Sequence, residues 1–540
     1  MKSLILTFSF FFFYNIGFSQ ISEPCAPPCY KVITGTGTNE TIQEIISLPN
    51  GRILAGGRLN DQVVLMQVTD DLEIKSTQHF DTPNSNDFVR KMLLDADGMY
   101  ITTTRDINVG ETQTGIQKIN PATGEIIWSK RIPSPAYFNI DRFLEISPTG
   151  NYIAAGILSS VNGCESFILE IDRNSGESVW SNRVNLGNCS FFEDAVLANG
   201  SIYGGGFHRY GYVDQIRAGI TRMDMQGNVV WSKHYLTNLS AAARTYITGF
   251  AATETELFAT IRGSLSDDDL TNSVAGFMRL DFEGNPMSGK YFTTIEGNSI
   301  AFNEVIRLDD GWALAGNYNN FADDNNRKLF VVKIDNDNNL VWAKAIGSTS
   351  FETANSLAAT DKTIIIAGTT KEFDATNGDF VIASLTLDGS GSSEDCEYIT
   401  DIELIETDFG AMIYQADSPV QGFSQTLNFL DFSTNTTEVE ELPEETFCSE
   451  LVDTDYISKE KYAINLYPNP NQGKVFLEGI DNLKGKYIVY DAVGREIQNG
   501  QLTNAITIKT LRSGVYFFKV LNQKNEVIFT KKMIVTPPRA

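Results

Sequence analysis

Histidine, the commonest catalytic base, is scarce in this chain of 540 residues. The three histidines, His79, His208 and His234, are widely separated in the sequence. A catalytic triad or a zinc centre needs histidine together with further nucleophilic, acidic or ligating groups. We therefore expect neither kind of site, and no catalytic residue can be assigned.

Acidic runs are the next candidates, because clustered carboxylates can bind calcium. Residues 335–339 (DNDNN) resemble the start of a calcium loop. The sixth position is Leu340 and the twelfth is Ile346, where such a loop has glycine and an acid. We interpret this run as a tight turn, and the acids at 267–269 and 323–324 as solvated loop charge. Weak calcium binding is the alternative; otherwise no cofactor or metal is expected.

A column of polar residues is the best candidate for a ligand site. Counting back from a turn in each of seven similar segments gives a polar residue where an innermost strand could be apolar. The column is Gln43, Arg90, Arg142, Glu193, Thr248, Glu304 and Asn355. In one interpretation it holds a polar ligand, with His208, Tyr210 and Tyr212 as an aromatic wall suited to stacking on a sugar. In the other, the charged members only neutralise one another and bind channel water.

The column is positioned by a repeat of about fifty residues. Its clearest phrase is a polar turn, a short apolar run and a tryptophan, at residues 120–132, 172–184, 224–235 and 335–346. Each repeat contains four short strands, with Asn-Gly or Asp-Gly turns typical of hairpins and small residues on the second strand. Four-stranded units repeated in this way predict a β-propeller. We expect an all-β chain, with a seven-bladed propeller over residues 20–393.

The last blade is predicted to be closed by the N-terminal segment. The seventh repeat lacks a fourth strand, and residues 30–34 precede a glycine spacing that repeats the one after the fourth strand of repeat six. Because strands alternate in direction, the 2–3 and 4–1 loops share one face. These loops are long and varied, so we expect ligand binding on this long-loop face.

Thr123, Gly124 and Trp128 resemble the motif that locks adjacent blades in quinoprotein-like propellers. The resemblance implies a mode of blade packing. Those enzymes also use adjacent cysteines and calcium ligands, and this chain has no adjacent cysteines. We therefore do not extend the redox chemistry to it.

The N-terminus and the cysteines indicate export. Residues 1–19 are predicted to be a signal peptide, with Lys2, a short apolar run, and small residues before Gln20. No later run is long and apolar enough to span a membrane. Export makes disulfides possible. We expect Cys164 to pair with Cys189, and a β module at residues 394–461 would have Cys396 paired with Cys448. The pairing of Cys25 and Cys29 stays open.

The net charge of −26 argues against binding nucleic acid, whose phosphates need basic patches. Residues 394–461 are acidic with a few strand-like runs. They form either a small β module or a linker lying on the propeller, and the sequence does not decide between these.

The last segment, residues 462–540, reads as a small β-sandwich. A YPNP opening, a D-x-x-G-R turn, an S-G-V-Y-F strand and a basic end occur in this order. This combination resembles the type A C-terminal sorting domain of the Bacteroidota type IX secretion system. The matching residues are Tyr467, Pro468, Asn469, Pro470, Gly473, Asp491, Gly494, Arg495, Gly514, Tyr516, Lys531 and Lys532. The resemblance implies the secretion machinery as a partner, passage through the periplasm, and release or attachment at the cell surface.

Together these features predict a secreted or cell-surface propeller protein that binds a glycan or a protein on its long-loop face. An adhesin or structural component, or a propeller hydrolase or lyase, is the alternative.

Overall fold

The computed structural model describes most of the chain between Pro27 and Val535. It describes residues 27–535 except 34–39, 60–61, 82–87, 99, 109–110, 121–122, 124, 133–136, 161–162, 186–190, 211–214, 237–243, 265–272, 320–326, 348–350, 372–377, 391–397, 409–412, 417–420, 425–429, 432–434, 439–443, 448–464, 469–470, 472–473, 481–483, 492–495, 509–513 and 523–526. The regular elements in this part are all strands, so the predicted all-β class is confirmed. The chain divides into two compact units, Met1–Ser449 and Glu450–Ala540.

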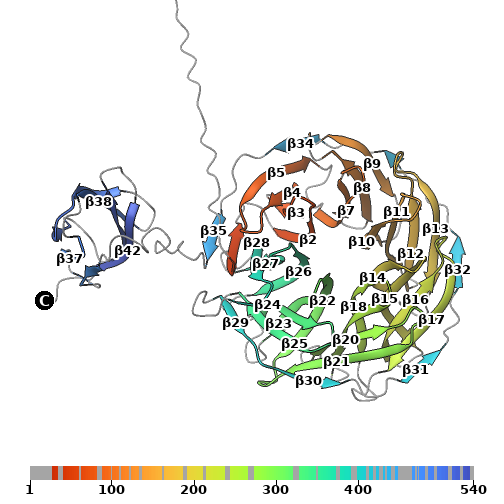
Figure 1. The fold of residues 1–540 in the computed structure, drawn as a ribbon. Helices are drawn as coiled ribbons and strands as arrows, with labels where there is room; N and C mark the ends of the chain where they lie inside the picture. Colours follow the sequence, from red (N-terminus) through yellow and green to blue (C-terminus); the bar gives the residue numbers. More distant parts are fainter. Residues whose placement is uncertain are drawn as a thin grey trace, which may run out of the picture. The chain divides into compact units, whose positions relative to one another are not determined.

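Seven five-stranded antiparallel sheets make up the first unit, side by side around a common centre as in a β-propeller (Figure 1). In sheets 1 to 6, four strands come from one repeat and follow chain order from the centre outward. Sheet 1 contains β2 (Thr41–Ser47), β3 (Ile53–Leu59), β4 (Gln62–Val68) and β5 (Ile74–Asp81). Sheet 2 contains β6 (Phe88–Leu94), β7 (Tyr100–Asn108), β8 (Glu111–Ile119) and β9 (Ile126–Ile132). Sheet 3 contains β10 (Tyr137–Ile146), β11 (Tyr152–Ser160), β12 (Gly163–Ile171) and β13 (Ser178–Asn185). Sheet 4 contains β14 (Phe191–Ala198), β15 (Ser201–Tyr210), β16 (Gln215–Met223) and β17 (Val229–Leu236).

Sheets 5 and 6 follow the same plan, whereas sheet 7 takes three strands from its repeat and one from the N-terminal end. Sheet 5 contains β18 (Thr245–Ala252), β19 (Leu257–Ser264), β20 (Ser273–Leu280) and β21 (Pro286–Thr294). Sheet 6 contains β22 (Ser299–Leu308), β23 (Gly311–Asn319), β24 (Arg327–Asp335) and β25 (Leu340–Ile346). Sheet 7 contains β26 (Glu352–Ala359), β27 (Thr363–Thr370), β28 (Asp379–Thr386) and β1 (Cys29–Ile33).

The N-terminal strand β1 lies in sheet 7, as an antiparallel partner of β28. Ile33 is opposite Phe380 and Tyr30 is opposite Ala383. Sheets 7 and 1 also share an apolar cluster that includes Ile42 and Ile382. The two ends of the array of sheets are therefore joined both by strand pairing and by packing.

The fifth, outermost strand of every sheet comes from residues 399–447, here called the belt. The belt visits the sheets in the order 6, 5, 4, 3, 2, 1 and 7, pairing antiparallel with each outer strand (Figure 1). Its strands are β29 (Ile399–Asp401), β30 (Leu404–Asp408), β31 (Ile413–Ala416), β32 (Gln421–Ser424), β33 (Leu430–Asp431), β34 (Asn435–Glu438) and β35 (Glu444–Phe447). Most of the segment that the sequence left as a module or a linker thus lies along the rim of the sheets.

Two ion pairs show why an acidic belt suits this rim. Asp401 accepts a hydrogen bond from Lys344 at 2.7 Å, and Glu406 accepts one from Lys290 at the same distance. The belt strands cover the outer edges of the sheets, which would otherwise present unpaired backbone groups.

The repeated tryptophans pack between neighbouring sheets. The Trp128 ring lies against Gly176 in a turn of the next sheet, where a Cβ atom would come within 2.7 Å of it. Trp128 Nε1 also donates a hydrogen bond to the carbonyl of Arg173 in that turn, at 3.2 Å. Trp342 contacts Gly389 in the same way. Blade packing by this phrase therefore has a direct basis in shape and in hydrogen bonding.

The second unit contains two small sheets around one core. The first sheet has β36 (Asn465–Tyr467), β37 (Lys474–Glu478) and β40 (Ala505–Thr507). The second has β38 (Gly485–Asp491), β39 (Glu496–Gln501), β41 (Gly514–Asn522) and β42 (Val527–Val535). Val475 of the first sheet and Phe518 of the second belong to the same buried cluster. This is the arrangement of a β-sandwich.

Candidate functional site

The polar column lies on a β-bulge in the innermost strand of the sheets. In β2 the register moves from Ile42 to Glu44 and leaves Gln43 without a cross-strand partner. The same irregularity leaves out Arg90, Glu193, Thr248 and Asn355, and a longer one in β10 includes Arg142. A bulge bends the strand and re-aims a side chain, so it gives these residues a common position.

Sheet 6 departs from the predicted column by one residue. Its bulged residue is Asn303, so Glu304 is the next residue along the strand. The two residues of the turn are Asp309 and Asp310, and Gly311 already belongs to β23. Counting from the glycine as a turn residue therefore placed the column one position too late.

The bulge also requires a small residue on the neighbouring strand. A Cβ atom at Gly57 would lie 2.0 Å from the carbonyl oxygen of Thr41. Gly206, Gly316 and Gly368 have the same close approach in their own sheets. At these positions the glycine is needed because the backbone of the bulged strand occupies the space of a side chain.

Several column residues contact one another across adjacent sheets. Arg142 Nη1 lies 2.6 Å from Glu193 Oε2, and Arg90 Nη1 donates to Gln43 Oε1 at 3.1 Å. The Asn355 side chain donates to the carbonyl of Ile42 at 2.7 Å. These contacts favour the interpretation in which the column residues satisfy one another. The Arg142 and Glu193 side chains keep 29% and 24% of their surface exposed, and so remain accessible to a ligand.

A second polar ring follows one residue later along the same strands. It contains Glu44, Lys91, Asp194 and Glu304, and each carboxylate or ammonium in it bonds to a neighbouring sheet. Lys91 Nζ lies 3.1 Å from Glu44 Oε2. Asp194 accepts a hydrogen bond from the Phe250 amide at 2.8 Å. Glu304 accepts one from the Leu357 amide at 3.1 Å.

Burial dominates the electrostatics of this ring. It raises the pKa of Asp194 to about 6, and with repulsion from Glu44 it raises the pKa of Glu304 to about 8. Burial also raises the pKa of Glu145, to about 7. For Lys91, burial opposes the charge, but Glu44, Glu304 and Asp194 outweigh it and raise the pKa. The ring connects neighbouring sheets through an ion pair and hydrogen bonds. In the described part of the chain, no three His, Cys, Asp or Glu side chains are arranged to hold a metal ion.

Of the three residues of the predicted aromatic wall, only His208 has a described side chain. His208 is 1% exposed. Burial, with a smaller contribution from His234, lowers the pKa of His208 to about 3. Its ring packs on Gly219, so it is neutral and is not available to stack on a ligand. Only the backbone of Tyr210 is described, and Tyr212 lies outside the described residues.

A different aromatic cluster stands beside the Arg142–Glu193 pair. It consists of Phe191, Phe207 and Tyr246, all partly exposed. The rings of Phe191 and Phe207 are 4.6 Å apart, and those of Phe207 and Tyr246 are 5.3 Å apart. The guanidinium of Arg142 lies 5.8 Å from the Phe191 ring. Sequence reasoning missed this cluster, although Phe191 and Tyr246 each stand two residues before a column residue.

The cluster is on the long-loop face. Phe191 is the first residue of β14, Tyr246 the second of β18, and Phe207 lies in the second half of β15 opposite Phe191. The chain enters inner strands and leaves second strands on that face. The aromatic cluster, Arg142 and Glu193 therefore present one mixed apolar and charged surface there.

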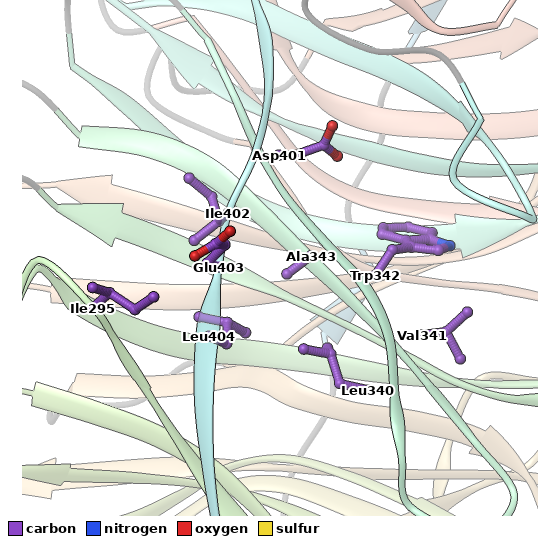
Figure 2. Close-up of a pocket in the computed structure, with 9 residues that line it drawn as sticks. All are labelled: Ile295, Leu340, Val341, Trp342, Ala343, Asp401, Ile402, Glu403 and Leu404. Atoms are coloured by element: carbon purple, nitrogen blue, oxygen red, sulfur yellow. The ribbon is translucent and has the colours of Figure 1, made fainter.

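A groove of about 400 Å³ lies elsewhere, where the belt crosses from sheet 6 to sheet 5 (Figure 2). It is lined by Trp342 and its neighbours on β25 and by the belt residues 401–404. The amide of Ile402 donates a hydrogen bond to the carbonyl of Ala343 at 3.0 Å. The groove therefore lies where the belt is attached to sheet 6. We assign no ligand to it.

The predicted disulfides stay a prediction, because Cys25, Cys189, Cys396 and Cys448 lie outside the described residues. The same holds for the signal peptide at residues 1–19. In the described part of the chain no helix is long and apolar enough to cross a membrane.

Comparison with solved structures gives weak likenesses. Hydrazine synthase of Kuenenia stuttgartiensis is 9% identical with a TM-score of 0.41, over 66% of this chain and 98% of that one. The polysaccharide lyase Uly1 is 9% identical with a TM-score of 0.37, over 66% and 91%. The phage phi92 endosialidase is 12% identical with a TM-score of 0.31, over 95% and 88%. At such values none of them indicates what this chain binds. No curated protein matches the sequence.

Comparison with protein families gives a definite result for the C-terminal unit. Residues 465–536 match the model of the secretion system C-terminal sorting domain. Of the predicted motif residues that the structure describes, Tyr467, Pro468 and Lys531 are exposed. Asn469, Pro470, Gly473, Gly494 and Arg495 lie outside the described residues. The match indicates delivery to the cell surface or beyond, with the type IX secretion machinery as the partner that recognises this unit. The C-terminal unit of this chain is therefore a type IX secretion system sorting domain.

Proposed function

We propose that the first unit is a secreted glycan-binding module, and that its ligand binds on the long-loop face. The observation that supports this most is the aromatic cluster beside the Arg142–Glu193 pair. Sugar rings have apolar faces and hydroxyl edges, so aromatic rings next to hydrogen-bonding groups are suited to them.

The electrostatic arrangement favours binding over catalysis. Glu304 and Asp194 have raised pKa values, as a general acid would. Their carboxylates, however, accept hydrogen bonds from the backbone of the next sheet. Structural ion networks also perturb pKa values, and this network already has a structural role. A binding experiment should therefore also measure product release, which would reveal a hydrolase or lyase activity.

A binding experiment on the full secreted chain tests the proposal. We expect enrichment on an array of neutral and acidic polysaccharides without release of reducing ends or unsaturated products. Changing Phe191 and Tyr246 to Ala should lower the affinity at least about tenfold. Each contact between an aromatic ring and the apolar face of a sugar contributes on the order of 1 kcal/mol. Phe282→Ala, on the tight-turn face, is the matched control and should bind normally.

Two outcomes would contradict the proposal. Product release on the array would identify an enzyme. Binding only to proteins or cells, unaffected by the Phe191 and Tyr246 changes, would favour an adhesin with a different surface.

A further inference from the structure

Two arginines on the long-loop face have no carboxylate partner in the described part of the chain. Several other described arginines lie beside a carboxylate; Arg279, for example, lies 2.7 Å from Glu256. Arg262 in β19 and Arg327 at the start of β24 have no such pair, although the protein carries 68 acids against 42 basic residues. In so acidic a chain, two half-buried cations without acids need an explanation.

Arg327 is held in a fixed plane. Its Nε donates a hydrogen bond to Asn319 Oδ1 at 3.0 Å. Its guanidinium carbon lies 4.4 Å from the centre of the Phe351 ring, which Lys371 Nζ also approaches, to 5.3 Å. Stacking and this one hydrogen bond orient the guanidinium. In the described part of the chain, its two Nη groups make no hydrogen bond, so the fork of donors is available.

Arg262 has a buried donor without an acceptor. Its Nε is enclosed and has no hydrogen-bond partner among the described residues. Leaving such a donor unsatisfied is unfavourable, because it loses its hydrogen bonds to water and gains none in the protein. Burial lowers the pKa of Arg262, and burial together with repulsion from Arg262 lowers the pKa of Arg327. A negative charge near either guanidinium would therefore stabilise it.

This pair continues the surface already described. Arg262 is the cross-strand partner of Tyr246, whose ring contacts Phe207 in the aromatic cluster. The aromatic cluster and the two arginines thus follow one another from sheet 4 through sheet 5 to sheet 6, all at the strand ends of the long-loop face.

We propose that Arg262 and Arg327 form an oxyanion subsite, which takes the carboxylate or sulfate ester of an acidic polysaccharide. Guanidinium groups bind planar or tetrahedral oxyanions through paired N–H donors. The aromatic cluster then contacts the sugar ring next to the charged group. The acidic-glycan part rests on the proposed function; the oxyanion subsite itself does not.

The simplest probe is inorganic sulfate, tested on the full chain by thermal unfolding. Ligand binding raises the unfolding temperature by mass action. Sulfate also stabilises proteins without binding to a site. Each variant is therefore measured in sulfate and in chloride at the same ionic strength, and the difference is compared between variants. We expect a sulfate-dependent rise in wild type that is lost in Arg262→Gln and in Arg327→Gln. Arg222→Gln is the control, because Arg222 pairs with Glu283 at 3.0 Å, and it should keep the rise.

The second arm uses polymers. Polygalacturonate carries carboxylates, dextran sulfate carries sulfate esters, and dextran is neutral. We expect binding to at least one acidic polymer, with the better one identifying the preferred oxyanion, and at least about tenfold weaker binding in the two Gln variants. Arg262→Lys and Arg327→Lys keep the charge without the planar fork and should bind at an intermediate level.

The outcomes separate the two proposals. Loss of the sulfate response in the Gln variants, without any polysaccharide binding, would support the subsite and contradict the glycan function. Equal binding of dextran and the acidic polymers would support the glycan function and overturn the subsite. An equal sulfate response in wild type and Gln variants would also overturn it. Because the two cations repel, the Gln variants should unfold at the same or a higher temperature without anion. A lower temperature with an unchanged sulfate response would show a structural role instead.

Discussion

At the scale of single residues, the inner strands carry two polar rings with different roles. The bulged residues, such as Arg142 and Glu193, stay partly exposed and pair across sheets. The residues that follow them, such as Asp194 and Glu304, are more enclosed and bond to the backbone of the next sheet. A shift of one residue along the strand thus separates a surface suited to a ligand from a network that joins the sheets.

Glu304 gives this network a testable pH dependence. Its folded pKa of about 8 is above its ordinary value of 4.5, so the folded protein holds a proton that the unfolded chain releases. Its contribution to stability is fully present below pH 4.5 and is lost as the pH rises through 8. Gln stays neutral and can still accept the Leu357 hydrogen bond. We therefore expect Glu304→Gln to reduce the loss of unfolding free energy between pH 5 and 8.5 by roughly 1–3 kcal/mol.

Chemical denaturation at a series of pH values measures this difference. Asp388→Asn is the control, since a hydrogen bond from the Ser390 amide lowers the pKa of Asp388 to about 2. That group is ionised in both states across the same range and should not change the slope. Identical slopes for wild type and Glu304→Gln would show that Glu304 is not protonated in the folded protein.

At the scale of the elements, the bulge explains the glycines of the second strands. Gly57→Ala would place a Cβ atom 2.0 Å from the Thr41 carbonyl, and backbone cannot move away cheaply. We expect a loss of about 2–4 kcal/mol in unfolding free energy, as for overpacking with backbone displacement. Gly51, in the turn of the same hairpin, has φ +77° and nothing within 4 Å of a Cβ. Gly51→Ala should cost only about 1 kcal/mol, for its conformation.

Urea unfolding of the two variants separates crowding from backbone strain. A Gly57→Ala protein as stable as Gly51→Ala would mean that the bulged strand shifts without cost, and that the bulge does not fix the position of Gln43.

The sequence predicted those features that depend on local pattern. Turn glycines, small second strands and tryptophans recur with the repeat, so the strands and the position of the polar column could be inferred. Glu304 was placed one residue from the column because a glycine can end a turn or begin a strand. His208 looked accessible because a single sequence does not show that its ring packs on Gly219. The sequence did not decide between a module and a linker on the propeller, because the belt strands have two to five residues and take their order from the sheets they join.

At the scale of the whole molecule, we expect the sorting domain to be needed for secretion but not for folding of the first unit. Its residues form their own buried cluster, and the chain divides at Ser449. Deleting residues 462–540 should leave the melting temperature of the first unit within about 2 °C, because no strand of the seven sheets is removed. The truncated protein should accumulate in the periplasm, which fractionation and immunoblotting would detect. Normal levels in the culture medium would show that delivery does not depend on this unit.

The belt also determines how the first unit would respond to tension on its C-terminal end. A load applied there reaches β35 first, then β34, and passes to β29 only after every intervening strand has detached. Each of these strands pairs with its sheet through a few backbone hydrogen bonds, so the strands would detach one after another. The four-stranded repeats would stay intact until the last of them had gone. Under load the belt would therefore lengthen the chain in small steps while the long-loop face kept its shape.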